Sequence, residues 1–472
     1  MILADEIVRY NTAGVDVVSG ATVTSAVTLA AIRECLTQAG APASLLEAPQ
    51  EPEKESETIA TQVLVIGSGA AGFGAAIAAA EAGAQVVMIE KQGVIGGSTI
   101  TSAGIVYAAL DEADVPVMAQ YYQERAEGKA DPEIVDFFAA NSANTIQWLT
   151  SHGVEWMFTA PAGTAPEARA NFSLNMTGAS LIEPLERAAD ELGVTIMTNV
   201  TATELTVDGS GRVTGALAEG KAADYTFEAG AVVLATGGFD ASEEMKQQYS
   251  PIAVGDFPLS SKGNTGDGIR MGMEVGAATE FKGGIIGFDF VDGSLPNSGQ
   301  NGIAMGAALY VTGEGEFICP LIDYPITYTN LKASGAESFF GIYDAAGAEN
   351  GDLAVSLGYG YKADTLEELA AAAGMDAALL AEAVATDEAL ANAPFYAVVV
   401  KPCTIGSMGG LKINTDAQVL METGEAIGGL YAAGEVANGG LYYQEYPASG
   451  TSNCMSFTFG IEAGTNAAAE VK

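Results

Sequence analysis

The chain has 472 residues, with 19 Lys and Arg against 60 Asp and Glu and hence a formal net charge of −41. This charge argues against binding to nucleic acid or to an anionic membrane surface, and the length predicts two or three domains with a large core. The four cysteines form no CxxC motif, so we predict no metal, haem or iron–sulfur site and no disulfide framework; they are Cys35, Cys319, Cys403 and Cys454.

The N-terminal part of the chain is predicted to form a small unit followed by a linker. Residues 1–40 contain a helix with apolar positions such as Val27, and Gly40 is a suitable helix stop. Residues 41–58 hold three prolines and five glutamates, a composition typical of an extended linker. The apolar runs are too short to span a bilayer and no secretory signal follows Met1. We expect no transmembrane segment, and a cytoplasmic chain as given, or an exported or membrane-associated one if earlier residues are missing.

Residues 62–91 predict a strand–helix–strand unit that binds a dinucleotide. An apolar strand runs into the pattern Gly67-x-Gly69-x-x-Gly72, an alanine-rich helix follows, and a second apolar strand ends in an acid. Gly67 permits the tight turn, Gly69 lets the backbone approach a pyrophosphate, and Gly72 lets helix and strand pack closely. The helix N-terminus offers free N–H groups to the phosphates. Glu90, about 20 residues on, suits a ribose hydroxyl.

The remaining segments predict an FAD-binding domain with an insertion. Residues 116–156 have a helical pattern with a stop at His152-Gly153, and a strand at 231–235 leads into the turn Thr236-Gly237-Gly238. A similar turn occurs at Gly429–Glu435, and two such small-residue turns, where backbone can pass close to a cofactor, favour FAD over NAD. We therefore predict an FAD-binding domain at 59–280 and 396–472, a tyrosine-rich capping domain at 281–395, a helix over 365–391 and a closing helix over 457–469.

On these motifs, the chain resembles the flavoprotein family that includes soluble fumarate reductases, urocanate reductase and the 3-ketosteroid dehydrogenases. The matching segments are residues 65–90, Gly96–Thr99, 233–238, Gly263–Gly268 and Gly429–Glu435. The resemblance implies an α/β fold, in which a Rossmann-like FAD-binding domain carries an inserted α+β capping domain and the substrate lies between cap and isoalloxazine. It implies FAD contacts at Gly67, Gly69, Ala70, Ala71, Gly72, Glu90, Lys91, Gly97, Ser98, Thr99, Gly104, Ala202, Ala235, Thr236, Gly237, Asp267, Gly434, Glu435, Ser449, Thr451 and Ser452.

The first unit resembles the C-terminal part of an FMN-binding domain found in some relatives. The pattern is Asp16-x-x-Ser19-Gly20-Ala21-Thr22, and the resemblance implies that Thr22 carries FMN through a phosphoester bond. A tethered FMN would act as an electron relay to the FAD site. The implied electron source is external, either a reduced flavin or a redox protein.

The chain departs from fumarate reductases where these bind a dicarboxylate. Bidentate recognition of carboxylates needs arginine, but no arginine follows Arg270. The family's Gly-x-Arg-Phe reads Gly315-Glu316-Phe317 here, and the only histidine, His152, is expected to end a helix rather than to act in catalysis. A neutral substrate is therefore predicted.

Tyrosines are the predicted replacement for this chemistry. The segment from Tyr446 to Ser452 resembles the ketosteroid branch, in which a tyrosine hydroxyl and the N–H of the glycine four residues later, here Gly450, bind a ketone oxygen. Such donors stabilise the enolate that forms when hydride adds to an enone. Tyr324 and Tyr328 are the candidate proton donors. Weaker candidates for the pocket wall are Tyr107, Tyr442 and Tyr443.

Three functions remain open from the sequence. The leading hypothesis is an FAD-dependent ene-reductase or dehydrogenase for a neutral, apolar enone such as a 3-ketosteroid. The second is an enoate reductase for an aromatic or imidazole acrylate, with Lys332, Lys362 or Lys401 as the carboxylate partner. The third is a non-catalytic electron-transfer flavoprotein, against which the tyrosine-rich cap argues because a carrier needs no enclosed pocket.

Overall fold

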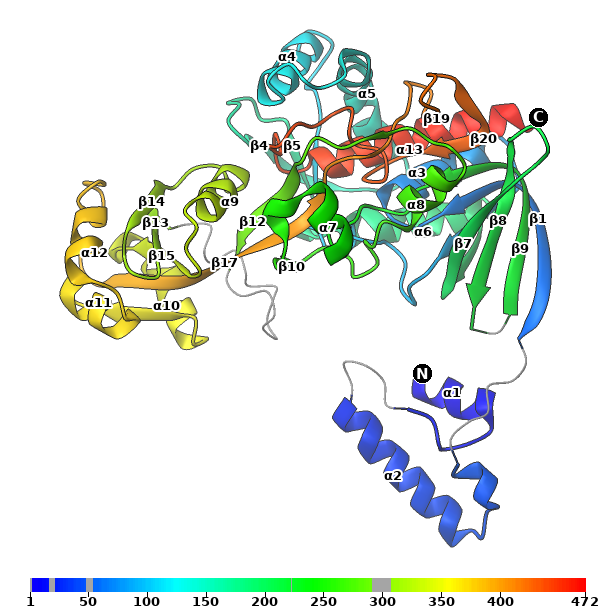
Figure 1. The fold of residues 1–472 in the computed structure, drawn as a ribbon, viewed down its shortest axis with the longest axis horizontal. Coiled ribbons are helices and arrows are strands. Elements are labelled where there is room, and N and C mark those ends of the chain that lie inside the picture. Colours follow the sequence, from blue (N-terminus) through cyan, green and yellow to red (C-terminus); the bar gives the residue numbers. More distant parts are fainter. Residues whose placement is uncertain (1, 17–21, 48–53, 222, 291–306) are drawn as a thin grey trace. The chain divides into compact units, whose positions relative to one another are not determined.

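The computed structural model describes residues 2–16, 22–47, 54–221, 223–290 and 307–472, and the chain divides into two compact units (Figure 1). The first unit comprises residues 1–57 with 221–224. Its helices are α1 (Ile2–Tyr10) and α2 (Thr22–Gln38), followed by the short 3₁₀ helix η1 (Ala43–Leu45). Its buried apolar side chains are few, Ala13, Val15 and Leu29 among them. The predicted helix is thus confirmed. Of the FMN-like motif, Ser19, Gly20 and Ala21 lie outside the described residues, and Thr22 begins α2.

The second unit contains the predicted dinucleotide-binding sheet. Its eight strands follow the order β19-β20-β9-β1-β2-β6, with β7 paired to β8 and β8 to β9. Strands β1, β2 and β6 are parallel neighbours, as are β20 and β9. The carboxyl ends of these parallel strands therefore meet at one edge, where ligands bind in folds of this type. The strands are β1 (Glu55–Ile66), β2 (Val86–Glu90), β6 (Thr195–Thr198), β7 (Val200–Val207), β8 (Val213–Gly220), β9 (Ala223–Leu234), β19 (Gln418–Leu420) and β20 (Ala426–Ala432).

Two helices, α3 (Ala70–Glu81) and α13 (Thr451–Glu470), lie side by side against this sheet (Figure 1). Their backbones approach so closely that a Cβ on Gly460 would lie 2.4 Å from the Ala71 carbonyl oxygen, and one on Gly464 2.1 Å from that of Ala75. Only glycine fits at these two positions. Helix α13 also begins six residues before the predicted start at 457, because Gly450, at φ 92°, turns the chain into it.

The helical segment predicted over 116–156 is divided into two helices, and its predicted stop at His152-Gly153 is confirmed because the second helix ends at Ser151. Helix α4 (Val115–Arg125) ends before Gly128, which has φ 69°. Helix α5 (Pro132–Ser151) begins after Asp131, whose carboxylate caps it by accepting a hydrogen bond from Glu133 N. The other elements of this unit outside the large sheet and the capping region are β3 (Ile105–Tyr107), β4 (Trp156–Ala160), β5 (Ala170–Ser173), η2 (Leu174–Met176), α6 (Ala179–Glu191), α7 (Glu243–Tyr249), η3 (Pro251–Ala253), α8 (Asp267–Glu274), β11 (Thr279–Glu280) and β18 (Gly410–Leu411).

The predicted capping region supplies most of a second, seven-stranded sheet. The long strand β17 (Phe395–Ser407) connects the sheet, since its first half pairs with β15 and β16 and its second half pairs with β10 and β12. It therefore crosses the domain boundary predicted at 395/396. The other elements are β10 (Phe257–Pro258), β12 (Ile285–Phe290), β13 (Leu309–Thr312), β14 (Phe317–Pro320), α9 (Tyr324–Ala333), β15 (Phe339–Tyr343), η5 (Ala345–Gly347), α10 (Ala348–Ser356), β16 (Gly360–Ala363), α11 (Leu366–Ala373) and α12 (Ala377–Val384).

The predicted helix over 365–391 is also two helices, α11 and α12. Gly374 ends the first in a left-handed conformation, at φ 78°, and Asp376 caps the second by accepting from Ala378 N and Leu379 N. Within the described parts of the chain, each helix is too short or too polar to cross a bilayer.

Candidate active site

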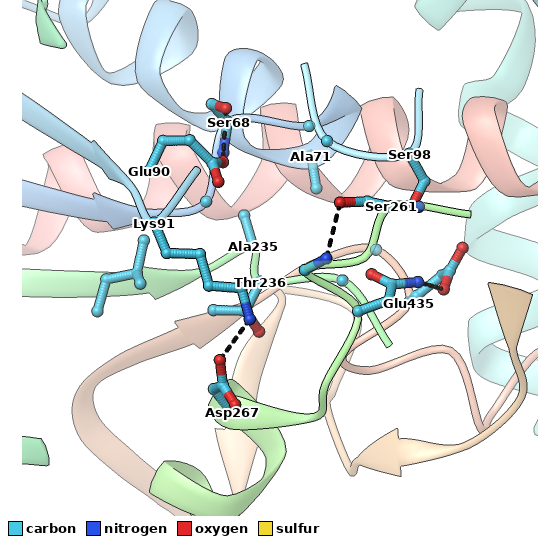
Figure 2. A pocket seen from close by; sticks show the side chains of 18 of the residues that line it. Ser68, Ala71, Glu90, Lys91, Ser98, Ala235, Thr236, Ser261, Asp267 and Glu435 are labelled. Carbon is cyan, nitrogen blue, oxygen red and sulfur yellow. Dashed lines mark hydrogen bonds and ion pairs between the residues drawn. The ribbon is translucent and has the colours of Figure 1, made fainter. Parts of the chain in front are cut away.

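A pocket of about 780 Å³ opens where strands β1, β2, β9 and β20 end (Figure 2). Its wall includes the turn after β1, the acid that ends β2 and the small-residue turns after β9 and β20. Most of the predicted FAD-binding residues come together here, from segments more than 300 residues apart in the sequence. They are Gly67, Gly69, Ala70, Ala71, Glu90, Lys91, Gly97, Ser98, Thr99, Ala202, Ala235, Thr236, Gly237, Asp267, Gly434 and Glu435.

The glycines of the β1–α3 turn shape the pocket as the sequence predicts. Gly67 has φ 105°, and a Cβ there would lie 2.2 Å from the carbonyl oxygen of Ala235. A Cβ on Gly72 would lie 1.9 Å from the Gly67 carbonyl oxygen, so Gly72 supports the turn from behind. A Cβ on Gly69 would meet no atom nearer than 3.9 Å. The space beside Gly69 is thus open for a phosphate at the α3 N-terminus.

Polar side chains define one end of the pocket (Figure 2). The Glu90 carboxylate accepts hydrogen bonds from Ser68 N and Oγ at 3.1 and 2.7 Å. Lys91 Nζ lies 2.5 Å from Asp267 Oδ2. Burial raises the pKa of Asp267, but the Lys91 ammonium and nearby donors outweigh that effect and hold it below its usual range. A carboxylate and an ammonium at this end suit the hydroxyl and phosphate oxygens of a nucleotide.

Other observations also fit a bound dinucleotide. The Thr236 hydroxyl is buried in the pocket wall without a hydrogen-bond partner among the described residues, as expected of a group that binds a ligand. Sequence reasoning missed several wall residues. Asn264 lies within a segment already matched to the family, so its motif contained the signal. The missed polar and glycine positions are Ser68, Gln92, Thr201, Ser261, Gly263, Asn264 and Ser456.

Four more predicted cofactor contacts lie outside the pocket wall and have other partners. Gly104 packs against Ser173, whose Oγ would be 2.1 Å from a Cβ there. Thr451 Oγ1 shares a hydrogen bond of 2.6 Å with the Tyr122 hydroxyl. Ser449 and Ser452 bind tyrosines. Contact of these four residues with the cofactor stays a prediction.

Two predicted catalytic tyrosines, Tyr324 from the cap and Tyr446 from the FAD-binding region, are brought together. Their ring centroids are 6.4 Å apart. The Tyr446 hydroxyl accepts a hydrogen bond from Ser452 N at 2.8 Å, and Ser449 Oγ donates to the Tyr324 hydroxyl at 3.2 Å. Burial raises the pKa of Tyr446, against the opposing effect of the N–H groups of Ser452 and Gly450. Tyr446 is thus neutral and keeps its own proton to donate.

Further aromatic rings extend this pair into a cluster. Phe288 lies 4.2 Å from Tyr324 and Tyr442 lies 5.8 Å from Tyr446, measured between ring centroids. The Tyr442 hydroxyl is buried and has no hydrogen-bond partner among the described residues. Burial is the main cause that raises the pKa of Tyr442 and of Tyr446. Glu435 of the pocket wall is close enough to raise both pKa values further. The cluster therefore lies near the Glu435 end of the pocket, opposite Lys91 and Asp267.

Tyr328, the other candidate proton donor, has a different environment. Its hydroxyl donates to Asp256 Oδ2 at 2.6 Å, and Lys332 Nζ lies 2.7 Å from Asp256 Oδ1. Burial and the Asp256 carboxylate both raise the pKa of Tyr328. Among the described residues, Tyr324 therefore contacts Tyr446, whereas Tyr328 hydrogen-bonds to the buried Asp256–Lys332 ion pair.

Other sequence candidates are also occupied elsewhere. Lys362 Nζ pairs with Asp352 Oδ1 at 2.7 Å on the surface. His152 ends α5 and its Nδ1 lies 2.8 Å from the Trp148 carbonyl oxygen, so the expected helix-ending role is confirmed. Tyr107 is buried beside Arg169, which forms a 2.6 Å ion pair with Asp114, and burial raises the pKa of Tyr107 to about 12. The Lys129 ammonium lies 3.8 Å from the centre of the Tyr443 ring.

An arginine that sequence reasoning missed interacts with the two acids that directly precede Tyr324 and Tyr446. Arg125, at the end of α4, places Nη2 3.0 Å from Glu445 Oε2. Asp323, directly before Tyr324, has a buried Oδ2 without a hydrogen-bond partner among the described residues. Burial raises the pKa of Asp323 to about 6, the Arg125 guanidinium and Tyr324 N–H lower it, and Glu445 raises it. One arginine thus faces the acids that precede Tyr324 and Tyr446.

Known proteins agree with this architecture. The FAD binding domain family matches residues 62–282 and 304–452. The chain is similar to the urocanate reductase of Eggerthella lenta, with 30% identity over 99% of this chain and 85% of that protein. It is also similar to the vinyl phenol reductase of Lactiplantibacillus plantarum, with 28% identity over 86% of this chain and 96% of that protein.

Solved structures agree in the same way. The open conformation of a flavocytochrome c3 fumarate reductase aligns with a TM-score of 0.73 and 31% identity, over 88% of this chain and 79% of that one. A 3-ketosteroid-Δ4-(5α)-dehydrogenase from Rhodococcus jostii aligns with a TM-score of 0.71 at 24% identity, over 87% of this chain and 97% of that one, and shows the fold alone.

These findings confirm the predicted α/β fold with its FAD-binding and capping regions, and the class of FAD-dependent oxidoreductase acting on CH–CH groups. They do not support the non-catalytic electron carrier. The chain belongs to the FAD binding domain family.

Proposed function

We propose that this protein reduces the C=C bond of an aromatic, acrylate-type electron acceptor. The observation that carries the proposal is the aromatic cluster of Phe288, Tyr324, Tyr442 and Tyr446 at the Glu435 end of the cofactor pocket. Aromatic side chains favour offset or edge-to-face contact with another ring. Two similar proteins carry names that specify ring-bearing alkenes, urocanate and vinyl phenol. This support favours the second sequence hypothesis over the ketosteroid one.

The cluster also supplies the groups that an alkene reduction needs. When bound and reduced by the external electron donor, the flavin would supply the hydride. The Tyr446 O–H and the Gly450 N–H hold the oxygen of the electron-withdrawing group, where negative charge develops. Tyr324 gives its proton to the neighbouring carbon as a general acid, and the Ser449 hydroxyl orients it. The low exposure of Tyr324 and Tyr446, 8% and 3%, keeps water from competing for these hydrogen bonds.

The lysines proposed as carboxylate partners are the weaker part of this hypothesis. Lys332 and Lys362 already bind Asp256 and Asp352. Arg125 faces two carboxylates, so a third would be repelled. The proposed recognition of the acid group therefore rests on the Tyr446 and Gly450 donors.

The experiment is anaerobic reoxidation of the dithionite-reduced protein by urocanate, cinnamate, fumarate and cyclohexenone. Urocanate or cinnamate should reoxidise it at least tenfold faster than fumarate. Reoxidation by fumarate alone would overturn the proposal.

A neutral enone is the second candidate. It is favoured by the lack of arginine after Arg270, which leaves neutral donors as the substrate-binding groups. In the same panel, turnover of cyclohexenone with neither aryl acrylate would establish this candidate instead.

A covalent FMN on Thr22 and an external electron donor complete the proposal. Support comes from the Asp16–Thr22 motif of the first unit. Intact-mass measurement of the protein from cells with a flavin-transferring enzyme should show one added FMN, absent in Thr22→Ala. An unchanged mass would remove this part while leaving the FAD chemistry intact.

A further inference from the structure

Two carboxyl groups share one amide at the wall of the cofactor pocket. Asn264 Nδ2 donates to Asp240 Oδ1 at 2.9 Å and to Glu435 Oε2 at 3.0 Å. The backbone N–H of Gly238 donates to Asn264 Oδ1 at 3.2 Å, which fixes the amide so that its NH₂ group points at both acids. Asp240 is 0% exposed and Glu435 lines the pocket (Figure 2). The burial of Asp240 and the nearness of the two carboxyl groups disfavour a state in which both are negatively charged.

The hydrogen-bond donors decide which acid keeps the charge. Asp240 receives hydrogen bonds from three side chains, because Ser260 Oγ lies 2.7 and 2.8 Å from its two oxygens and Thr404 Oγ1 lies 3.0 Å from one, in addition to Asn264. Burial raises the pKa of Asp240, and these donors together with the fully buried Lys246 ammonium oppose that rise. Such donors stabilise the ionised form.

Glu435 has much weaker support for a charge. Besides Asn264, it accepts a long hydrogen bond of 3.3 Å from Ser407 N, and the backbone N–H of Gly238, which also donates to Asn264, lowers its pKa as well. Tyr442 and Tyr446 also face it, and burial keeps both phenols neutral. Burial and the Asp240 charge raise the pKa of Glu435 to about 8. The negative charge therefore resides on Asp240, and the proton on Glu435.

We propose that Glu435 is a neutral carboxylic acid in the FAD-loaded protein and donates its O–H into the cofactor pocket, with Asp240 as its ionised partner. A neutral Glu435 removes a negative charge that would oppose electron uptake by the cofactor. The role is distinct from ordinary contact with a ribityl or ring oxygen, because it depends on the protonation state of a pair. Ionisation of Glu435 above about pH 8 should lower the flavin midpoint potential.

The test compares wild type, Glu435→Gln, Asp240→Asn and Asp344→Asn, all loaded with FAD. Asp344 is the matched control, since it is a buried acid in the capping region that accepts Ala346 N and Asn392 N. Flavin absorbance of the oxidised protein and its midpoint potential are followed through a pH range centred on about 8. An infrared spectrum reports the carboxylic-acid C=O stretch.

Wild type and Asp344→Asn should show an inflection near pH 8 and a carboxylic-acid band that changes when the flavin is reduced. Glu435→Gln should retain FAD and lose both signals. Asp240→Asn should move the inflection to lower pH, because the neighbouring charge is gone. A band that persists in Glu435→Gln, or an Asp240→Asn inflection at the wild-type pH, would overturn the proposal. If Asp240→Asn does not fold, the infrared comparison of wild type with Glu435→Gln still decides it.

Discussion

The rings of Tyr324 and Tyr446 lie with their centroids 6.4 Å apart, although the two residues are 122 positions apart in the chain. Tyr324 begins α9 in the capping region, and Tyr446 lies in the segment before α13. We expect Tyr446→Phe to lower kcat by about 10²–10³-fold, the usual effect of removing one donor to a developing oxyanion. Tyr324→Phe should lower it by about 10²–10⁴-fold through loss of the general acid. Stopped-flow reoxidation with the best acceptor measures both. Rates within threefold of wild type (roughly the spread of neutral changes) would remove these roles.

Tyr328→Phe is predicted to affect stability rather than chemistry. Its hydroxyl binds the buried Asp256, and loss of a hydrogen bond to a charged group costs about 1.5–3 kcal/mol. Urea unfolding should show this loss, while kcat stays within a few-fold because Lys332 still pairs with Asp256. A selective fall in kcat with unchanged unfolding free energy would instead make Tyr328 a participant in the reaction.

Arg125 should control the acid limb of the pH profile through Asp323. Burial raises the pKa of Asp323 to about 6, although Arg125 lowers it. As the pH falls through that value, the Asp323 carboxylate becomes protonated and its attraction to Arg125 disappears. Arg125→Met should raise that pKa and move the acid limb of kcat to higher pH. Glu445→Gln provides a control of opposite sign, since Glu445 raises the pKa of Asp323, so the limb should move to lower pH. Identical acid limbs in all three proteins would contradict this coupling.

The Lys91–Asp267 pair should contribute to FAD affinity and leave the reaction itself unaltered. Lys91→Met removes the ammonium at the nucleotide end of the pocket and should weaken FAD binding by about tenfold, which corresponds to about 1.4 kcal/mol. Fluorescence titration of the apoprotein with FAD measures the loss. With saturating FAD, kcat should return to the wild-type value; a persistent deficit would place Lys91 nearer the chemistry than its ion pair indicates.

Much of the FAD site could be predicted because its signals are local. Gly67, Gly69 and Gly72 lie within six residues, and their spacing follows from one turn between a strand and a helix. The break between α4 and α5 had a local signal too, in Gly128 and the Asp131-Pro132 step.

The roles of the tyrosines could not be assigned in this way. Tyr324 and Tyr328 are four residues apart and so share a face of α9, separated by about 6 Å along its axis. That one turn takes the first to Tyr446 and the second to Asp256. Which contact each makes depends on how the cap packs on the FAD-binding region, and no local pattern encodes it. The same holds for Asn264, which joins two acids distant in sequence.

The glycine contacts between α3 and α13 fix the spacing of two helix N-termini, at Ala70 and Thr451. The first begins beside the open space at Gly69, and the second begins five residues after Tyr446, whose hydroxyl accepts a hydrogen bond from Ser452 N. Because no side chain separates the helices at Gly460 and Gly464, neither can slide along the other. The phosphate end of the site, at the start of α3, and the tyrosine end, at the start of α13, are therefore held at a constant separation by backbone packing rather than by side chains.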